Sequence, residues 1–329
     1  MKLCQTTARI SCHGISTLVW DEEDLVDVTS NQRIHLDGSV TQSQFGLAYE
    51  FDRAVCLRES RSFWAVAYAN RGTAAALMKN GKFHRQLNRD FNHAEWFDYP
   101  VTLAPRADGR IVVIHCPRSY NTLEFEDAET GEILEVKTSE GMEFHSRLAV
   151  SPNGRFLLSA GWFWHPLCGV WLCALQESPD GMPGSNELAF SYGYEFDSAA
   201  FLDDDRLVLT TTAEGVNTGI PKTGLGSLKL GVWKISETKW ISTADLAEPS
   251  GLIMPWQDWV ISFYGHPKAI ELTTGAVVHR WDQVNSGRQV GAIDLGDPSP
   301  PLVALDPRGG RFAVSGPDGI TVVTLSSTA

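Results

Sequence analysis

Residues 145–161 read HSRLAVSPNGRFLLSAG and decide the local fold of this part of the chain. Leu148–Val150 and Phe156–Leu158 are short apolar runs, separated by Ser151-Pro152-Asn153-Gly154. Pro and Gly favour tight turns, and β-rich apolar runs on both sides of such a turn form the arms of a hairpin. The stretch therefore predicts two antiparallel strands joined by a turn.

The same pattern recurs along the chain. Leu103–Ile114 and Leu305–Ser315 repeat the two apolar runs around a turn that contains Pro and Gly. In four places a Phe followed by Asp or His comes at intervals of 46, 47 and 52 residues, in Phe51-Asp52, Phe97-Asp98, Phe144-His145 and Phe196-Asp197. Propeller blades repeat every ~40–50 residues, so the spacing favours a β-propeller.

Two further strands complete each unit. The third strand is clearest in Gly169–Leu175 and Gly231–Ser236, and a fourth follows a Thr-Gly turn in Thr130–Val136 and Thr274–Val278. Four strands per unit is the architecture of a propeller blade. Counting units gives seven, at residues 14–42, 43–88, 89–137, 138–189, 190–241, 242–281 and 282–325.

The last unit ends after its third strand, Ile320–Leu325. A spare β-like segment at the N-terminus, Thr7–Cys12, is available as its fourth strand. Closing the ring in this way removes the exposed sheet edges of an open array. The sequence thus predicts an all-β chain that forms one domain over residues 1–329, a seven-bladed β-propeller with four-stranded blades.

These units resemble WD40 repeats. The family pattern has a His or Asp before the first strand and then an apolar strand, Ser-Pro-x-Gly-Arg, and a second apolar strand, which His145–Gly161 matches almost throughout. The chain departs from the pattern where Trp-Asp ends the third strand, because it has Trp171-Leu172 and Trp233-Lys234 instead. The resemblance implies a diverged WD40-like propeller that binds a protein partner.

Composition narrows the class of partner. The formal net charge is −13, which disfavours nucleic acid as a ligand and favours a basic protein partner. The six cysteines show no CxxC spacing, and no apolar run approaches the roughly 18 residues that a spanning helix needs. We therefore expect a cytoplasmic protein with reduced thiols and no membrane association. One specific hypothesis is a neutralising, immunity-type partner of a basic effector.

Catalytic signatures are missing from the sequence. It has no HExxH, EF-hand, P-loop, Gly-x-Ser-x-Gly or dinucleotide motif, so we expect binding rather than catalysis, with no catalytic residue, metal or cofactor. The alternative is a metal-dependent hydrolase or lactonase at the mouth of the propeller channel. Its ligands would come from His93, Glu95, Glu143, His145 and Glu195.

The candidate partner-binding residues lie in two sets of loops that a propeller brings to one face. These are the loops that lead into the first strand of a blade and those between its second and third strands. Trp and Tyr dominate interface hot spots, so aromatic residues in these loops are the expected anchors. The predicted set contains His93, Glu95, Trp96, Trp162, Trp164, His165, Tyr194, Tyr264 and His266.

Other repeated residues have structural interpretations. We expect the polar residue of each repeat to form hydrogen bonds within its blade, at Asp52, Asp98, His145 and Asp197. The preceding Phe residues are predicted to pack between blades. Trp64, Trp171 and Trp233 lie in apolar strands and are expected in the core.

Overall fold

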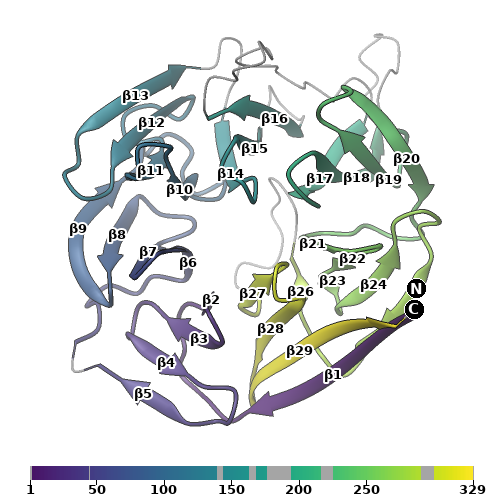
Figure 1. Ribbon diagram of the computed structural model, residues 1–329, viewed down its shortest axis with the longest axis horizontal. Helices are drawn as coiled ribbons and strands as arrows, with labels where there is room; N and C mark the ends of the chain where they lie inside the picture. Colours follow the sequence, from purple (N-terminus) through teal and green to yellow (C-terminus); the bar gives the residue numbers. More distant parts are fainter. Residues whose placement is uncertain are drawn as a thin grey trace.

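The computed structural model describes residues 2–43, 45–138, 144–162, 168–175, 194–215, 225–289 and 300–328. The side chains of residues 162, 194, 195, 214 and 215 also lie outside the description. The described residues form twenty-nine strands and contain no helix. Seven sheets surround a common axis, which confirms the seven-bladed β-propeller (Figure 1). No helix in the described part of the chain is long and apolar enough to cross a membrane.

The first three blades follow the predicted strand order, from the axis outward. Their strands are β2 (Val19–Asp21), β3 (Asp24–Asp27), β4 (Gln32–Ile34) and β5 (Val40–Gln42); β6 (Arg53–Glu59), β7 (Ser62–Tyr68), β8 (Ala74–Lys79) and β9 (Lys82–Asn88); and β10 (Val101–Pro105), β11 (Ile111–His115), β12 (Thr122–Asp127) and β13 (Ile133–Thr138).

The remaining blades repeat this arrangement. Blade 4 contributes three described strands, β14 (Phe144–Val150), β15 (Phe156–Trp162) and β16 (Cys168–Ala174). Blades 5 and 6 consist of β17 (Tyr194–Phe201), β18 (Arg206–Gly215), β19 (Lys229–Lys234) and β20 (Lys239–Asp245); and of β21 (Ile253–Trp256), β22 (Trp259–Ser262), β24 (Lys268–Glu271) and β25 (Val277–Arg280). A short ribbon of β23 (Tyr264–Gly265) and β26 (Gly287–Arg288) adjoins blade 6.

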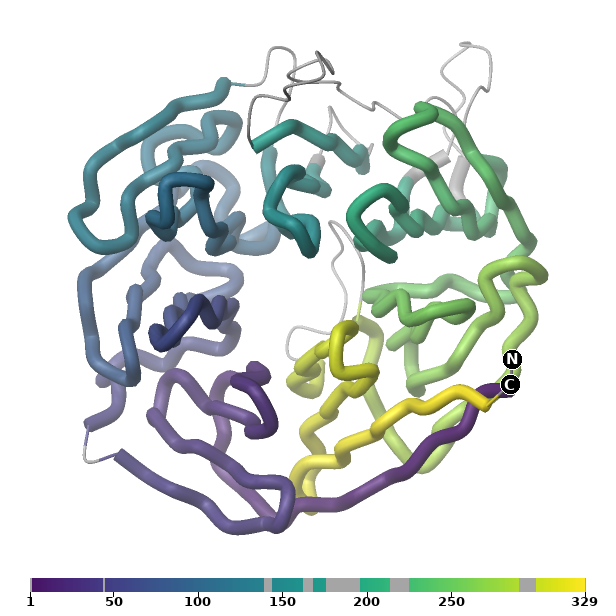
Figure 2. Tube along the Cα trace, viewed as in Figure 1, coloured from purple at the N-terminus to yellow at the C-terminus, as the bar shows by residue number. Residues whose placement is uncertain are grey.

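The N-terminal strand closes the ring. Blade 7 consists of β27 (Val303–Asp306), β28 (Arg311–Gly316), β29 (Gly319–Thr328) and, on the outside, β1 (Lys2–Ile10). β1 pairs with β29 from Lys2 opposite Thr328 to Ile10 opposite Ile320, which places the two termini side by side (Figure 2). The predicted closure is confirmed, but the strand is longer than predicted and ends at Ile10, because Ile10 is buried in the core beside Leu18 and Trp20.

The hairpin of blade 4 shows why the repeated turn forms. The Ser151 hydroxyl accepts hydrogen bonds from the backbone N–H groups of Arg155 and Phe156, at 3.1 and 2.9 Å. Gly154 has a φ of +71°, a conformation that glycine adopts without a steric penalty. The Ser-Pro-x-Gly pattern thus sets both the turn and the pairing of β14 with β15.

Apolar side chains fill the spaces between the blades. Phe51, Phe97 and Phe196 are buried, and the Phe97 ring packs against Phe144 of the next blade at 4.9 Å between ring centroids. This contact confirms the predicted inter-blade role for Phe97 and Phe144. The strand tryptophans are buried as expected, at Trp64, Trp171 and Trp233.

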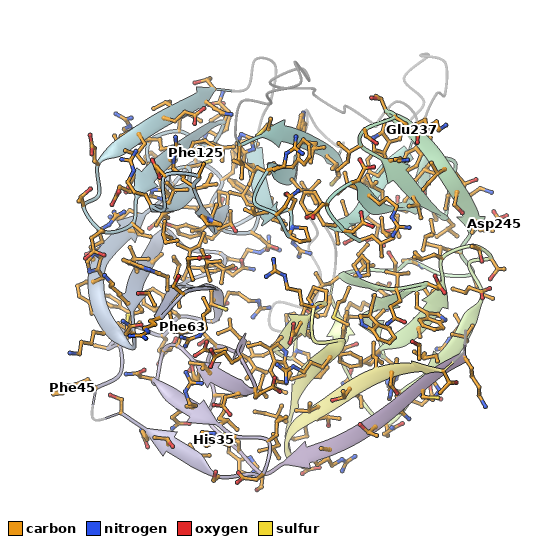
Figure 3. All side chains as sticks on the ribbon, in the orientation of Figure 1. His35, Phe45, Phe63, Phe125, Glu237 and Asp245 are labelled. Atoms are coloured by element: carbon orange, nitrogen blue, oxygen red, sulfur yellow. The ribbon has the colours of Figure 1, made fainter. Side chains whose placement is uncertain are left out.

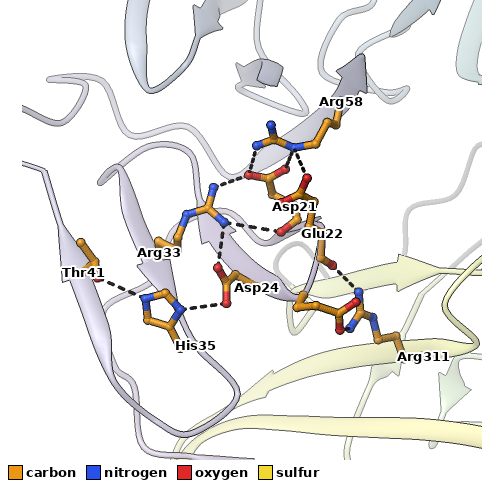
Figure 4. A network of polar contacts seen from close by, with 9 residues as sticks. Asp21, Glu22, Asp24, Arg33, His35, Thr41, Arg58 and Arg311 are labelled. Atoms are coloured by element: carbon orange, nitrogen blue, oxygen red, sulfur yellow. Dashed lines mark hydrogen bonds and ion pairs between the residues drawn. The ribbon is translucent and has the colours of Figure 1, made fainter. Parts of the chain in front are cut away.

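A polar network joins the blades on the face where the first hairpins turn (Figure 4). Asp21, at the end of β2, has a fully buried side chain that accepts hydrogen bonds from Arg33 and Arg58. Burial alone would raise the pKa of Asp21, but the bonds from Arg58 and Arg33 outweigh it and hold this pKa below its usual value. Arg311 of β28 bonds to the Glu22 carbonyl, so blades 7, 1 and 2 are linked.

Candidate partner-binding rim

The segment between β9 and β10, residues 89–100, is the rim loop of blade 3. It meets the loops between second and third strands, as the propeller arrangement predicts. The Asp90 N–H donates to the Cys116 carbonyl at 3.1 Å, and the Tyr120 N–H donates to the Asp90 carboxylate at 3.2 Å. These two sets of loops therefore share one face of the ring.

The rim loop exposes large side chains. Trp96 is 45% exposed and Phe91 is 82% exposed, and His93 and Glu95 between them are also exposed. Tyr49, in the equivalent loop before β6, is 67% exposed. Burying a large aromatic side chain is favourable, so exposed rings on one face make this rim a candidate binding surface.

A buried arginine holds this loop from beneath. Arg89 is 4% exposed and donates hydrogen bonds to three carbonyls within the rim loop, those of Ala94, Phe97 and Asp98. Its remaining bonds go to the carbonyls of Asn70 and Gly72, in the loop between β7 and β8. One guanidinium group thus fixes two neighbouring loops of the face relative to each other.

Arg89 remains a cation in this environment. Desolvation by burial lowers its pKa to about 10, which still leaves the group charged at pH 7. The rings of Phe97 and Tyr99 lie 4.8 and 5.1 Å from its guanidinium carbon and supply cation–π contacts. The oriented carbonyls and the two rings replace the water that the cation has lost.

Aromatic packing supports the loop from the side of blade 4. Tyr120 stacks on Phe144 with ring centroids 4.2 Å apart, and His93 meets the same ring edge-on at 5.7 Å. Phe144 also contacts Phe97, so the rings tie the rim loop to β14. The exposed anchors Phe91 and Trp96 are therefore carried by a backbone that is braced on two sides.

The repeated polar position forms hydrogen bonds, but several of them run between blades. Asp197 of blade 5 accepts from the N–H groups of Ser250 and Gly251 of blade 6, at 2.9 and 2.8 Å. Asp98 accepts from Asn70 of blade 2 at 2.8 Å, whereas Asp52 accepts from the Asn70 N–H within its own blade at 2.7 Å. The prediction of bonds confined to one blade is wrong for Asp98 and Asp197, because the carboxylate ends reach the adjoining loops.

His145 forms hydrogen bonds both inside blade 4 and to blade 3. Its Nδ1 lies 2.7 Å from the Ser159 hydroxyl, and the imidazole is buried. Desolvation lowers the pKa of His145 to about 4, so the ring is neutral at pH 7. The imidazole also forms a hydrogen bond to the backbone of Asn121, in the loop between β11 and β12 of blade 3. The prediction of a structural hydrogen-bonding role is therefore confirmed, but its restriction to one blade is wrong for His145 too.

The predicted anchors do not form one patch. Tyr264 and His266 are partly exposed beside blade 6, and Figure 1 places β23 across the ring from β9 and β10. Trp164 and His165 lie outside the described residues, and the side chains of Trp162 and Tyr194 are outside the description as well. Trp96, His93 and Glu95 are the predicted residues that the structure places together.

Sequence reasoning missed Phe91, Tyr49 and Arg89. Phe91 stands between Asp90 and Asn92, and an aromatic residue between turn-forming residues is a usable signal for an exposed ring. Arg89 gives no such signal, because its role depends on carbonyl groups that only the fold gathers. Exposure alone does not define the face, since Phe45 projects from the outer edge of the ring (Figure 3).

The residues of the alternative metal site are dispersed where they are described. His93 and Glu95 are exposed on the rim, whereas His145 is buried against Ser159. Glu143 lies outside the described residues, as does the side chain of Glu195. In the described part of the chain, no three His, Cys, Asp or Glu residues form a group that could hold a metal ion.

Comparisons with known proteins bear on the fold. No known sequence family and no curated protein matches the chain. Among solved structures, it is similar to Kuenenia stuttgartiensis hydrazine synthase, with a TM-score of 0.58, 11% sequence identity and coverage of 96% of each chain. A likeness at this identity concerns the fold alone. The chain is a seven-bladed β-propeller whose function must be inferred from its own surface.

Proposed function

We propose that the chain is a non-enzymatic, protein-binding propeller that engages its partner through the rim loop of blade 3. The observation that carries the proposal is the combination of exposed Phe91 and Trp96 with a buried brace at Arg89. A preorganised loop loses little conformational freedom on binding, so more of the contact energy appears as affinity. Aromatic anchors on such a loop are the usual form of an interface hot spot.

The proposal includes a diverged WD40-like classification. Blade 4 supports it, because His145 bonds to Ser159, and Ser159 pairs across the sheet with Trp171 of the third strand. These positions match the polar residue, second strand and third-strand Trp of the WD40 pattern. WD40-like propellers act as rigid platforms for partners, in agreement with the braced rim.

The partner that we propose is a basic protein. A net charge of −13 attracts cationic proteins over a distance and raises their association rate. Glu95 and Glu50 stand beside the exposed rings of Trp96 and Tyr49, so acidic groups also border the anchors. A neutralising, immunity-type role toward a basic effector is one specific form of this proposal.

The test compares partner capture by matched variants. The wild-type chain, Phe91→Ala/Trp96→Ala and Phe83→Ala are immobilised and exposed to extract of the cells that produce the protein. Phe83 is the control, because its ring is 58% exposed on the outer strand β9, away from the rim. Bound proteins are identified by mass spectrometry, and their affinities are then measured with purified components.

We expect the double variant to lose a partner that the wild type and Phe83→Ala retain. Its affinity should fall by more than tenfold, because truncating a hot-spot aromatic residue costs about 2 kcal/mol or more. Circular dichroism should show the same fold in all three chains. Equal capture by all three would refute the rim as the binding surface, and a retained partner of strongly acidic character would refute the charge argument.

A further inference from the structure

Three arginines gather at the inner end of the rim, beside the first strands that surround the axis. Arg53 begins β6, Arg71 lies in the loop between β7 and β8, and Arg147 lies on β14. Burial raises the pKa of the Tyr68 hydroxyl, and the charges of Arg53 and Arg147 both act to lower it, so blades 2 and 4 contribute to one cluster around this group. The cluster is notable because the chain as a whole carries 40 acidic and 27 basic residues.

One buried carboxylate draws two of these cations together. Asp98 accepts a hydrogen bond from Arg147 Nε at 2.5 Å, and Arg71 Nε lies 3.7 Å from its other oxygen. The Asp98 side chain is only 12% exposed, whereas those of Arg71 and Arg147 are 35% and 28% exposed. Arg147 therefore contacts Asp98 through its Nε and remains partly exposed to solvent.

Arg53 and Tyr68 extend the cluster. They are directly opposite each other in the β6–β7 pairing, so their side chains are neighbours on one face of the sheet. Arg53 donates to the Asp52 carbonyl at 2.8 Å, and the Asp52 carboxylate accepts from the Asn70 N–H. Burial, followed by the charge of Asp98, raises the pKa of Tyr68, so its hydroxyl is a neutral hydrogen-bond donor at pH 7.

Arg147 is the arginine of this cluster whose guanidinium group can offer donors to a ligand. Within the described residues, neither Nη group of Arg147 has a hydrogen-bond partner. A planar guanidinium with two unoccupied N–H groups matches the two oxygens of a carboxylate or phosphate.

We propose that Arg53, Arg147 and the hydroxyl of Tyr68 form a site for a single oxyanion, a carboxylate or a phosphate group. Arg71 borders the site and links it to the anchors, because it also bonds to the Trp96 carbonyl. The site itself is independent of the proposed function. A protein partner that supplies the anion would be attracted by the net charge of the chain and then oriented by this site. Only this last step rests on the proposed protein-binding function.

The test uses two small probes that separate the sources of the oxyanion. Binding of inorganic phosphate is followed by phosphorus NMR line broadening, and binding of succinate by saturation-transfer proton NMR, both at constant ionic strength. The variants are Arg53→Gln and Arg147→Gln. Arg110→Gln is the matched control, because Arg110 is a partly exposed arginine with a carboxylate partner, Asp108, on the opposite face.

We expect saturable binding of at least one probe to the wild type and to Arg110→Gln. Arg53→Gln and Arg147→Gln should each weaken it about tenfold, the change expected when one charged hydrogen bond is lost. Stronger binding of succinate would assign the site to a carboxylate, and stronger binding of phosphate to a phosphate group.

Two results would overturn the proposal. One is the absence of saturable binding of either probe to the wild type. The other is equal weakening by Arg110→Gln, which would show general charge attraction. Arg53 makes no direct contact with Asp98, so Arg53→Gln retains the bond between Arg147 and Asp98 that joins blades 4 and 3. This variant can therefore test the site even if Arg147→Gln unfolds. A loss of protein capture in Phe91→Ala/Trp96→Ala with unchanged anion binding would separate this site from the proposed function.

Discussion

Arg89→Met should release the rim loop without unfolding the propeller. The substitution retains an apolar stem of similar length and removes every donor that holds the loop. Arg89 bonds to five buried or partly buried carbonyls, those of Asn70, Gly72, Ala94, Phe97 and Asp98. The lost donors determine the size of the effect.

The loss of stability in Arg89→Met depends on whether the five carbonyls stay buried or the loop opens. An unsatisfied buried acceptor costs about 1–3 kcal/mol, so leaving all five carbonyls unpaired would cost roughly 5–15 kcal/mol. Detaching residues 90–99 lets these groups reach water and recovers backbone entropy of about 1–2 kcal/mol per residue. The loop therefore opens first, and we expect the free energy of global unfolding to fall by only about 3–5 kcal/mol, less than the cost of leaving all five carbonyls buried and unpaired.

Hydrogen exchange measured by mass spectrometry checks this prediction. In the wild type, the N–H groups of Ala94, Trp96 and Asp98 are hydrogen-bonded, to Phe91, His93 and Ser146. Peptides covering residues 90–99 should lose protection in Arg89→Met, while peptides from β6 to β8 keep theirs. Arg89→Lys, which retains a cation with fewer donors, should be intermediate. Unchanged protection in Arg89→Met, or a loss of stability below about 1 kcal/mol, would refute the bracing role.

Three further predictions concern the scaffold. Asp21→Asn should lower the free energy of unfolding in urea by about 2–3 kcal/mol at pH 7, because it leaves Arg33 and Arg58 without their shared charge. Since the folded-state pKa of Asp21 is depressed, this contribution is present above pH ~4 and is lost as the pH falls through the folded value. A difference between variant and wild type that does not shrink as the pH is lowered below ~4 would contradict this cause. His145 has a pKa of about 4 in the folded chain, below an unfolded value near 6.5. The free energy of unfolding should therefore fall by about 2 kcal/mol from pH 7 to pH 5, as the unfolded state takes up the proton. If His145→Gln showed the same dependence of unfolding free energy on pH as the wild type, His145 would be excluded as the cause. Ile10→Ala should destabilise the chain by about 2–5 kcal/mol through a cavity beneath the closing strand, whereas an unchanged urea midpoint would show that Ile10 does not anchor β1.

The fold could be predicted because its determinants are local and repeated. Ser151-Pro152-Asn153-Gly154 specifies a turn through its own hydroxyl and glycine, and glycines with positive φ recur in the corresponding turns of blades 3 and 7, at Gly109 and Gly310. Ring closure was predicted from an incomplete last unit. The start of β1 at Lys2 was not, because its exposed side chains follow no apolar pattern and backbone pairing with β29 defines the strand.

The site was predicted less completely, for a physical reason. Trp96 was identified because an aromatic residue in a loop is visible in the sequence. Its separation from Tyr264 depends on the order of the blades around the ring, which loop composition does not encode. Arg89 and Arg147 were missed because their partners lie in other loops or blades, and only the assembled ring brings those groups within hydrogen-bonding distance.

The repeated polar position is bonded differently from blade to blade. Asp197 accepts hydrogen bonds from backbone and hydroxyl donors of blade 6, and His145 bonds to Ser159 of its own blade and to the Asn121 backbone of blade 3. Asp98 differs, because two of its contacts come from arginines that remain partly exposed. Ser250 satisfies Asp197 without charge, whereas Asp98 is satisfied in part by the partly exposed Arg147. This difference, next to the braced and exposed Trp96, is the reason that we propose the inner rim of blades 2 to 4 as the place where a ligand binds.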